Sequence, residues 1–143
     1  MRNFFFGGAG GGSRTADIGL LILRMVGGLG LAFGHGLGKF PPSERFIEGV
    51  SRLGFPEPTI FAWGAALAEL GGGILLAIGL LTRPASLAIA FTMGTAAFRS
   101  NYGEPFAEME KALLYMAIAV CFLFAGAGRY AVDALLRRRG RRG

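Results

Sequence analysis

The sequence predicts an all-α protein, an integral membrane four-helix bundle with a short amphipathic interfacial helix between the first and second spans. The composition favours a membrane location, because 52% of the residues are hydrophobic and only 17% are charged. Residues 60–81 form a run of 22 with a single charge, Glu69, and about 20 apolar residues in a helix suffice to cross a bilayer. Many of the 25 glycines lie inside apolar runs, which favours closely packed membrane helices over a flexible linker.

The 143 residues suit one compact domain with short extensions. We expect a flexible glycine-rich cytoplasmic leader over residues 1–16, the transmembrane domain over residues 17–133 and a basic cytoplasmic tail over residues 134–143. The net charge of +6 comes largely from that tail, which predicts contact with anionic lipid and argues against nucleic acid as a partner. The only cysteine, Cys121, excludes a dithiol pair within the chain, and its apolar surroundings predict a packed, inert thiol.

The first span is expected over residues 18–38, and it carries a polar stripe. Arg24 and His35 are 11 residues apart, a spacing that returns to within about 20° of the same helix face. Asp17 lies on that face, with Lys39 at the exit of the span. Thr15 or Asp17 can serve as the N-cap. Glycines spaced by four residues should let a neighbouring backbone approach: Gly30, Gly34 and Gly38.

The long loop over residues 40–59 should contain the interfacial helix, with Ser43 as its cap and Gly54 after its end. Apolar residues recur there at helical spacing, while charged residues take the opposite side. The apolar side consists of Phe46, Ile47, Val50 and Leu53, and the charged side of Glu44, Arg45, Glu48 and Arg52. This pattern is typical of a helix that lies on a membrane surface.

The second span is expected over residues 60–81, the third over 84–98 and the fourth over 109–125, with Glu110 in the first turn of the last. A carboxylate near the bilayer midplane is costly and usually faces a partner, a cavity or a pathway. Glu69 therefore either acts in proton transfer or forms a buried structural ion pair with Arg24. Small residues also repeat on one face of the third span, at Ala88, Thr92 and Ala96.

The distribution of Lys and Arg predicts the orientation. With four spans, nine of the 15 basic residues lie on the side of the two termini, five lie on the other side and Arg24 lies within the membrane. Because the cytoplasmic side carries the excess of positive charge, both termini should be cytoplasmic.

The order and spacing of several short pieces, spread over residues 17–133, resemble the DoxX family of small membrane proteins. These pieces are Arg24, His35-Gly36-x-x-Lys39, Gly54-Phe55-Pro56-x-Pro58, Glu69-x-x-Gly72-Gly73, Gly79-Leu80-Leu81-Thr82-Arg83, Glu110 and Gly126-x-Gly128-Arg129-Tyr130-x-x-Asp133. The resemblance implies a four-helix bundle in the bacterial inner membrane that is associated with redox chemistry. Some members are linked to thiosulfate oxidation with electrons passed to quinone, and others to thiol and oxidative-stress complexes.

Five ionisable residues are the candidates for a site, and we expect them to converge on one pocket among the first, second and fourth spans. His35 and Glu69 are the candidate catalytic residues, as hydrogen-bond donor and proton carrier. The candidate substrate-binding residues are Arg24, Lys39 and Glu110. Each has a structural alternative, as interhelical glue, ion-pair partner or interfacial anchor. The single histidine argues against a metal site within the chain.

The leading hypothesis for function is a membrane subunit of an oxidoreductase system that passes electrons from a partner protein to quinone. The sequence contains no flavin, iron–sulfur or dithiol motif, so the redox chemistry would need that partner. Two alternatives stay open at this point. One is an accessory subunit that anchors or stabilises a larger membrane complex, and the other is a small transporter or lipid-binding protein. Formation of a homo-oligomer is open as well.

Overall fold

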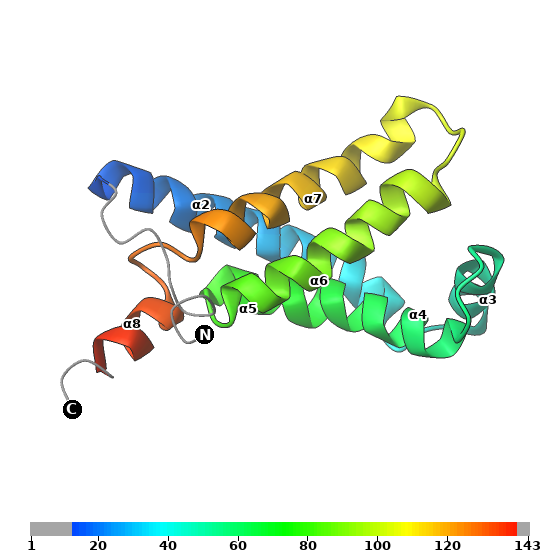
Figure 1. The fold of residues 1–143 in the computed structure, drawn as a ribbon, viewed down its shortest axis with the longest axis horizontal. Coiled ribbons are helices and arrows are strands. Elements are labelled where there is room, and N and C mark those ends of the chain that lie inside the picture. The colour runs from blue at the N-terminus through cyan, green and yellow to red at the C-terminus, as the bar shows by residue number, and fades with distance from the viewer. Residues whose placement is uncertain (1–12, 140–143) are drawn as a thin grey trace.

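The computed structural model describes residues 13–139, and every regular element in that part of the chain is a helix. Four long helices form an elongated bundle (Figure 1). The first runs from α2 (Arg14–Leu31) through the π-helical turn η1 (Ala32–Gly36) into η2 (Leu37–Lys39). The second consists of α4 (Pro58–Leu67), the π-helical η3 (Ala68–Gly72) and α5 (Gly73–Ile78). The third consists of α6 (Thr82–Thr95) and the π-helical η4 (Ala96–Ser100). The fourth is α7 (Phe106–Ala125).

Two short helices lie at opposite ends of this bundle. The helix α3 (Glu44–Arg52) lies beside the start of α4, and α8 (Val132–Arg139) lies near the turn between α5 and α6 (Figure 1). The start of α2 lies at the same end of the bundle as α8, so both ends of the described chain are at that end (Figure 1). The all-α class is confirmed. Most of the predicted leader, residues 1–12, and the last part of the predicted tail, residues 140–143, are outside the described residues. The rest of the predicted tail, residues 134–139, belongs to the helix α8.

Two of the helices described are long and apolar enough to cross a membrane, Arg14–Lys39 and Pro58–Ile78. That judgement rests on their length and composition. The third and fourth long helices have comparable length, but each carries charged residues near an end. Four membrane crossings therefore remain a prediction.

Local capping explains where several helices begin and end. Ser13 caps α2 by accepting a hydrogen bond from the Ala16 backbone N–H at 3.2 Å. The prediction that Thr15 or Asp17 caps this helix was wrong. Ser43 caps α3 as predicted, accepting from the Phe46 N–H at 3.3 Å. The apolar side of α3 faces inward, since Val50 is buried. Glu44 and the other charged residues of this helix are exposed.

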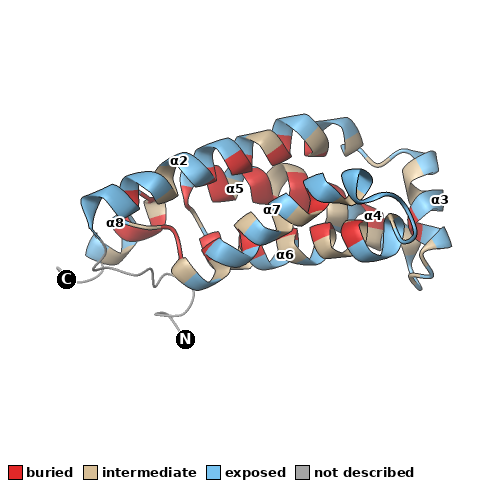
Figure 2. Cartoon of the chain, turned by 90° about the horizontal axis from the view of Figure 1, so that it is seen from above, coloured by how far each residue is buried: buried red, intermediate tan, exposed pale blue. Residues whose placement is uncertain are grey.

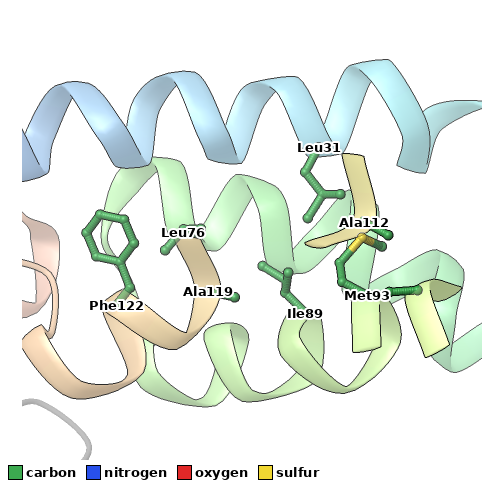
Figure 3. Packing of buried hydrophobic residues seen from close by; sticks show 8 residues of the cluster. Leu31, Leu76, Ile89, Met93, Ala112, Ala119 and Phe122 are labelled. Atoms are coloured by element: carbon green, nitrogen blue, oxygen red, sulfur yellow. The ribbon is translucent and has the colours of Figure 1, made fainter. Parts of the chain in front are cut away.

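The core lies where all four long helices meet, and their inward faces are the buried ones (Figure 2). Leu31 from α2 and Leu76 from α5 pack there with Ile89 from α6 and Phe122 from α7, each at most 1% exposed (Figure 3). The outward faces carry large apolar side chains instead, such as Val26, which is 70% exposed. An apolar outer surface of this kind suits a lipid environment.

Glycines bring the first and second long helices into backbone contact, although not at the predicted positions. A Cβ added at Gly36 would lie 2.4 Å from the backbone nitrogen of Leu70, and one added at Gly28 would lie 2.5 Å from the carbonyl oxygen of Gly73. By contrast, a Cβ at Gly34 or Gly38 would meet nothing within 4 Å. The third member of the predicted stripe, Gly30, does lie in a close contact, because a Cβ there would be 3.0 Å from the Tyr115 hydroxyl of α7. The prediction that this stripe admits a neighbouring backbone was therefore wrong. The face that packs is offset from it, and it places η1 directly against η3.

Candidate functional site

A buried ion pair joins the end of the first long helix to the middle of the second. The Lys39 ammonium lies 2.6 Å from Oε1 of Glu69 and donates a hydrogen bond to it. The Glu69 side chain is 1% exposed and that of Lys39 is 35% exposed. Lys39 also lies 5.5 Å from the ring centroid of Phe46, so its cation faces an aromatic ring of α3. The pair thus connects η2, α3 and η3.

Only half of the Glu69 carboxylate is satisfied. Its second oxygen, Oε2, is buried and has no hydrogen-bond partner among the described residues. Lys39 carries three N–H donors, of which one binds Glu69. Lys39, which is 35% exposed, can therefore donate further hydrogen bonds from Nζ, whereas Oε2 is enclosed by protein. A buried polar atom without a partner is unusual in a folded protein.

The π-helical turn η3 places Glu69 at this position. Such turns add one residue to a helical turn, and they occur frequently at functional sites. Gly36 of η1 presses against the backbone of Glu69 and Leu70, since a Cβ there would lie 2.8 Å from the Glu69 carbonyl carbon. Close backbone contact on this side leaves the Glu69 side chain to reach Lys39 and the space beyond it.

That space is a cavity of about 410 Å³ beside the ion pair, and we call it the α3–α4–α6 cavity. Among the described residues, Lys39 and Glu69 are the only charged ones that line it. The remaining walls are apolar or small: Phe46, Val50 and Leu53 from α3; Phe55; Ile60, Phe61, Gly64, Ala65 and Ala68 from α4 and η3; and Ala88, Phe91, Thr92, Thr95, Ala96 and Ser100 from α6 and η4. Cavities of about 300–1,000 Å³ with apolar walls and few polar groups are typical of small-molecule sites.

Two walls of the cavity reach the outer surface of the bundle. Ile60 on the α4 wall is 68% exposed, and Phe91 on the α6 wall is 58% exposed. Both lie on the outer, apolar surface of the bundle. Ring contacts connect the wall next to α3 with α4 and η4. The Arg99 guanidinium lies 5.3 Å from the Phe55 ring centroid, and the ring centroids of Phe55 and Phe61 are 4.4 Å apart. The α4 and α6 walls therefore extend from the ion pair to the apolar outer surface.

Arg24 does not take part in this site, and the predicted Arg24–Glu69 pair was wrong. The Arg24 side chain donates to the carbonyl oxygens of Ala127, at 3.0 Å, and Tyr130. It also lies against Gly79, ten residues beyond Glu69 along the second long helix. Ten residues of helix correspond to about 15 Å. Arg24 is therefore near the end of the bundle that holds α8.

The polar groups at the α8 end form a structural cluster around Asp133. This buried carboxylate accepts hydrogen bonds from the backbone N–H groups of Leu81 and Thr82 and from the Thr82 hydroxyl, at 2.9–3.0 Å. It thereby caps α6, which begins two residues before the predicted third span. Asp17 accepts a hydrogen bond from the Arg129 N–H at 3.0 Å. The pieces Gly79–Arg83 and Gly126–Asp133 of the family resemblance thus meet in one place, together with Asp17 and Arg24.

His35 and Glu110 also lie outside the α3–α4–α6 cavity. The half-buried His35 ring packs edge-on against Tyr115 of α7, with centroids 5.4 Å apart. Glu110 is exposed on α7. The prediction that five ionisable groups converge on one pocket was therefore wrong. The predicted walls were wrong too, because α3 and α6 line the cavity and α7 does not. Which groups act in chemistry stays a prediction.

Sequence reasoning missed the α3 and α6 walls, although both left a signal. The apolar stripe of α3 supplies Phe46, Val50 and Leu53, and the small-residue repeat of the third span supplies Ala88, Thr92 and Ala96. Neither pattern by itself distinguishes a cavity wall from ordinary packing. The prediction that Cys121 is packed was also wrong, because its side chain is exposed on α7. Among the described residues, no three His, Cys, Asp or Glu side chains are grouped closely enough to hold a metal ion.

The chain is similar to known proteins over most of its length. The family model DoxX matches residues 19–101, which include Arg24, His35, Lys39 and Glu69. The Bacillus subtilis (strain 168) protein named "Putative oxidoreductase CatD" is 34% identical over 109 residues, covering 74% of this chain and 79% of that protein. The Escherichia coli (strain K12) protein named "Inner membrane protein YqjF" is 33% identical over 137 residues, covering 88% of this chain and 98% of that protein.

No solved structure matches the chain significantly. The family model covers more than half of the sequence, and both relatives are aligned over most of their own length. The resemblance seen in the sequence pieces is therefore confirmed: the chain belongs to the DoxX family.

Proposed function

We propose that this protein is the membrane subunit of an oxidoreductase system in the bacterial inner membrane, and that it binds a quinone in the α3–α4–α6 cavity. The observation that carries the proposal is the Lys39–Glu69 pair, buried at the wall of an apolar cavity with one carboxylate oxygen unused. The names of the two relatives, one an oxidoreductase and one an inner membrane protein, support the same assignment.

The chemistry of the cavity suits an amphipathic ring compound. Its aliphatic and aromatic walls suit the ring and its hydrocarbon tail. Ile60 and Phe91 carry these walls to the apolar outer surface, where a quinone dissolved in the lipid would meet them. The Lys39 ammonium can donate a hydrogen bond to a carbonyl oxygen of the ring. The volume of about 410 Å³ accommodates the headgroup, while a longer tail would extend between α4 and α6 into the bilayer.

Reduction of a quinone to a quinol consumes two electrons and two protons. With a single cysteine, the chain has no internal dithiol to supply electrons, so a redox partner protein delivers both. The role of this chain is to bind and orient the ring and to supply protons. Glu69 is the candidate proton carrier, and Lys39, which is 35% exposed, connects the pair to the outside of the bundle.

Filling the cavity with a larger side chain should weaken quinone binding. In Gly64→Leu a leucine would extend into the cavity, and its Cβ would meet nothing within 4 Å, so the helix itself is not disturbed. We expect at least a tenfold loss of affinity for a short-chain quinone, measured by calorimetry in detergent. Gly34→Leu is the matched control, since Gly34 is equally open but lies outside the cavity. Equal affinities for the two variants would reject the site and favour a purely accessory subunit.

We further propose that both termini are cytoplasmic, which places Lys39, Glu69 and α3 toward the outer side of the membrane. The support is the excess of basic residues on the side of the termini, and the common location of α8 and the start of α2 (Figure 1). Reporter fusions at residue 143 and within residues 43–53 should report opposite sides of the membrane. A cytoplasmic signal from both positions would overturn this orientation.

A further inference from the structure

We infer that α8 is an interfacial helix that binds anionic phospholipid. Its exposed leucines lie among the acyl chains just below the headgroups, and its arginines bind the headgroup phosphates. α8 is at the end of the bundle opposite α3 (Figure 1), so this role does not depend on the proposed quinone site. Three features of the helix lead to it: its position, its exposed side chains and the charges around it.

α8 begins at an end of the bundle that lies at a membrane surface. The first long helix, Arg14–Lys39, has 26 residues. Such a helix is about 39 Å long, whereas the hydrocarbon core of a bilayer is about 30 Å thick, so its start reaches the headgroup region. The segment that leads into α8 lies beside this start, because the Arg129 N–H donates to Oδ1 of Asp17 at 3.0 Å. α8 therefore starts at the level of the headgroups.

The first turn of α8 is fixed to the bundle, and this determines which side chains the helix exposes. The Asp133 N–H donates to the Gly79 carbonyl oxygen at 2.9 Å, and the Asp133 carboxylate accepts from the start of α6. Ala134 is buried on the same side. Leu135 and Leu136, by contrast, are 58% and 46% exposed. A helix held in this way keeps both leucines outside the bundle, where acyl chains are their favourable surroundings.

Arginine provides the exposed charge at this end of the molecule. Arg138 of α8 and Arg14 of α2 are exposed, and the Arg129 side chain is 45% exposed. Within the part of the chain that the structure describes, the carboxylates at this end, Asp17 and Asp133, are buried. The result is a positive surface at the headgroup level. Its chemistry suits phosphate, because the planar guanidinium of arginine matches the geometry of a phosphate group.

The leucines favour lipid over an acidic soluble protein as the partner of this surface. Arg138 follows Leu135 by three residues, a spacing that makes the two side chains neighbours on the helix. The leucine can therefore enter the acyl region while the long arginine side chain reaches the phosphates. An acidic protein would neutralise the arginines but would have to displace lipid from the leucines.

The other amphipathic helix, α3, shows what an interfacial helix without this preference looks like. Its exposed charges are balanced: Glu44, Arg45, Glu48 and Arg52. We therefore expect α3 to contact anionic and zwitterionic lipid alike, and α8 to prefer the anionic one. The contrast also supplies matched control positions for the experiments.

Thermal unfolding of the unmodified protein tests the preference. The protein, in micelles of a zwitterionic detergent, is titrated with phosphatidylglycerol, phosphatidylcholine or inorganic phosphate. We expect phosphatidylglycerol to raise the Tm at a concentration about tenfold lower than phosphatidylcholine does, and inorganic phosphate to have no effect at that concentration. Equal responses to the two lipids would overturn the inference. An equal response to inorganic phosphate would overturn it as well, since the surface would then bind soluble anions.

Arg138→Gln tests the residue. The concentration of phosphatidylglycerol that gives half of the Tm increase should rise about fivefold, which is the contribution of one basic residue near an anionic membrane surface. Arg45→Gln removes an equally exposed arginine from α3 and should leave that concentration unchanged. If the two variants respond alike, α8 does not carry the preference.

The depth of α8 in the membrane is measured with a fluorophore on Leu136→Cys in a Cys121→Ala background. In nanodiscs that contain phosphatidylglycerol, we expect lipids with a quencher on the acyl chain to quench this fluorophore and aqueous acrylamide to leave it nearly unaffected. A fluorophore on Glu48→Cys, at an exposed position of α3, should show the reverse. Quenching of residue 136 by acrylamide alone would place the leucines in water, overturn the inference and leave this surface to a soluble acidic protein.

Discussion

Lys39→Met is expected to lose about 3 kcal/mol of unfolding free energy, because it leaves the Glu69 carboxylate buried without its cation. We place the loss at the low end of the range for broken buried pairs, since Lys39 is 35% exposed. Glu69→Leu should cost far less, because the remaining ammonium can reach water along its flexible stem. The double variant should resemble Glu69→Leu. Stability would be measured by equilibrium unfolding in detergent.

The larger loss of stability in Lys39→Met than in Glu69→Leu is the result that identifies a buried carboxylate dependent on its cation. Lys111→Met is the control for the loss of one positive charge, since Lys111 is exposed on α7. If Lys39→Met and Lys111→Met unfold alike, the ion pair does not form as described. If Glu69→Leu proves the more damaging single change, the carboxylate is stabilised by groups other than Lys39.

Asp133→Ala should destabilise the other end of the bundle by at least ~3 kcal/mol. The substitution removes the acceptor for two backbone N–H groups at the start of α6 and for the Thr82 hydroxyl. It also removes the negative charge that interacts with the buried Arg24 guanidinium. Three donors, two of them buried, would lose their acceptor, and the buried Arg24 guanidinium would lose its nearby negative charge. These losses are costly around a carboxylate that is 4% exposed.

Thermal unfolding in detergent would measure this loss, with Glu108→Ala as control for an exposed carboxylate on α7. Because Arg24 and Asp133 belong to one cluster, adding Arg24→Met to Asp133→Ala should cost less than the sum of the two single losses. Additive losses would mean that Arg24 is stabilised by the carbonyls of Ala127 and Tyr130 alone. A silent Asp133→Ala would contradict the capping role.

The sequence predicted the elements of this fold well because their signals are local. The apolar run around Glu69, the amphipathic stripe of α3 and its Ser43 cap all depend on residues within a few turns of one another. The length of the third long helix was underestimated for the opposite reason. Its first turn is capped by Asp133, 51 residues beyond Thr82, and no local pattern announces that contact.

The partners of the buried charges depend on long-range packing in the same way. Arg24 and Glu69 were expected to pair because both would lie near the bilayer midplane on antiparallel neighbouring helices, where an unpaired charge is costly. Position along the helices does not fix how the two helices are rotated toward each other. The backbone contact of Gly36 with Leu70 sets how the two helices meet, and it brings Lys39, not Arg24, to Glu69. Four-residue glycine spacing suggested a different face, since spacing identifies a stripe without saying what it faces.

The cavity was beyond prediction because its walls come from segments as far apart as Lys39 and Ser100. Each wall, taken alone, resembles an ordinary packing or lipid-facing surface. Only the tertiary arrangement shows that the apolar side of α3, the small residues of α6 and the buried carboxylate of η3 surround one space.

Photolabelling with an azido-quinone is the most direct test of the central claim that quinone binds beside Lys39 and Glu69. After irradiation of the protein in lipid and proteolysis, mass spectrometry should find the label within residues 46–68 or 88–100, which hold nearly all of the cavity walls. Labelling should be suppressed by excess short-chain quinol and by Gly64→Leu, but not by Gly34→Leu. Label concentrated on α7 near Tyr115 and Glu110, or labelling that Gly64→Leu leaves unchanged, would contradict the account.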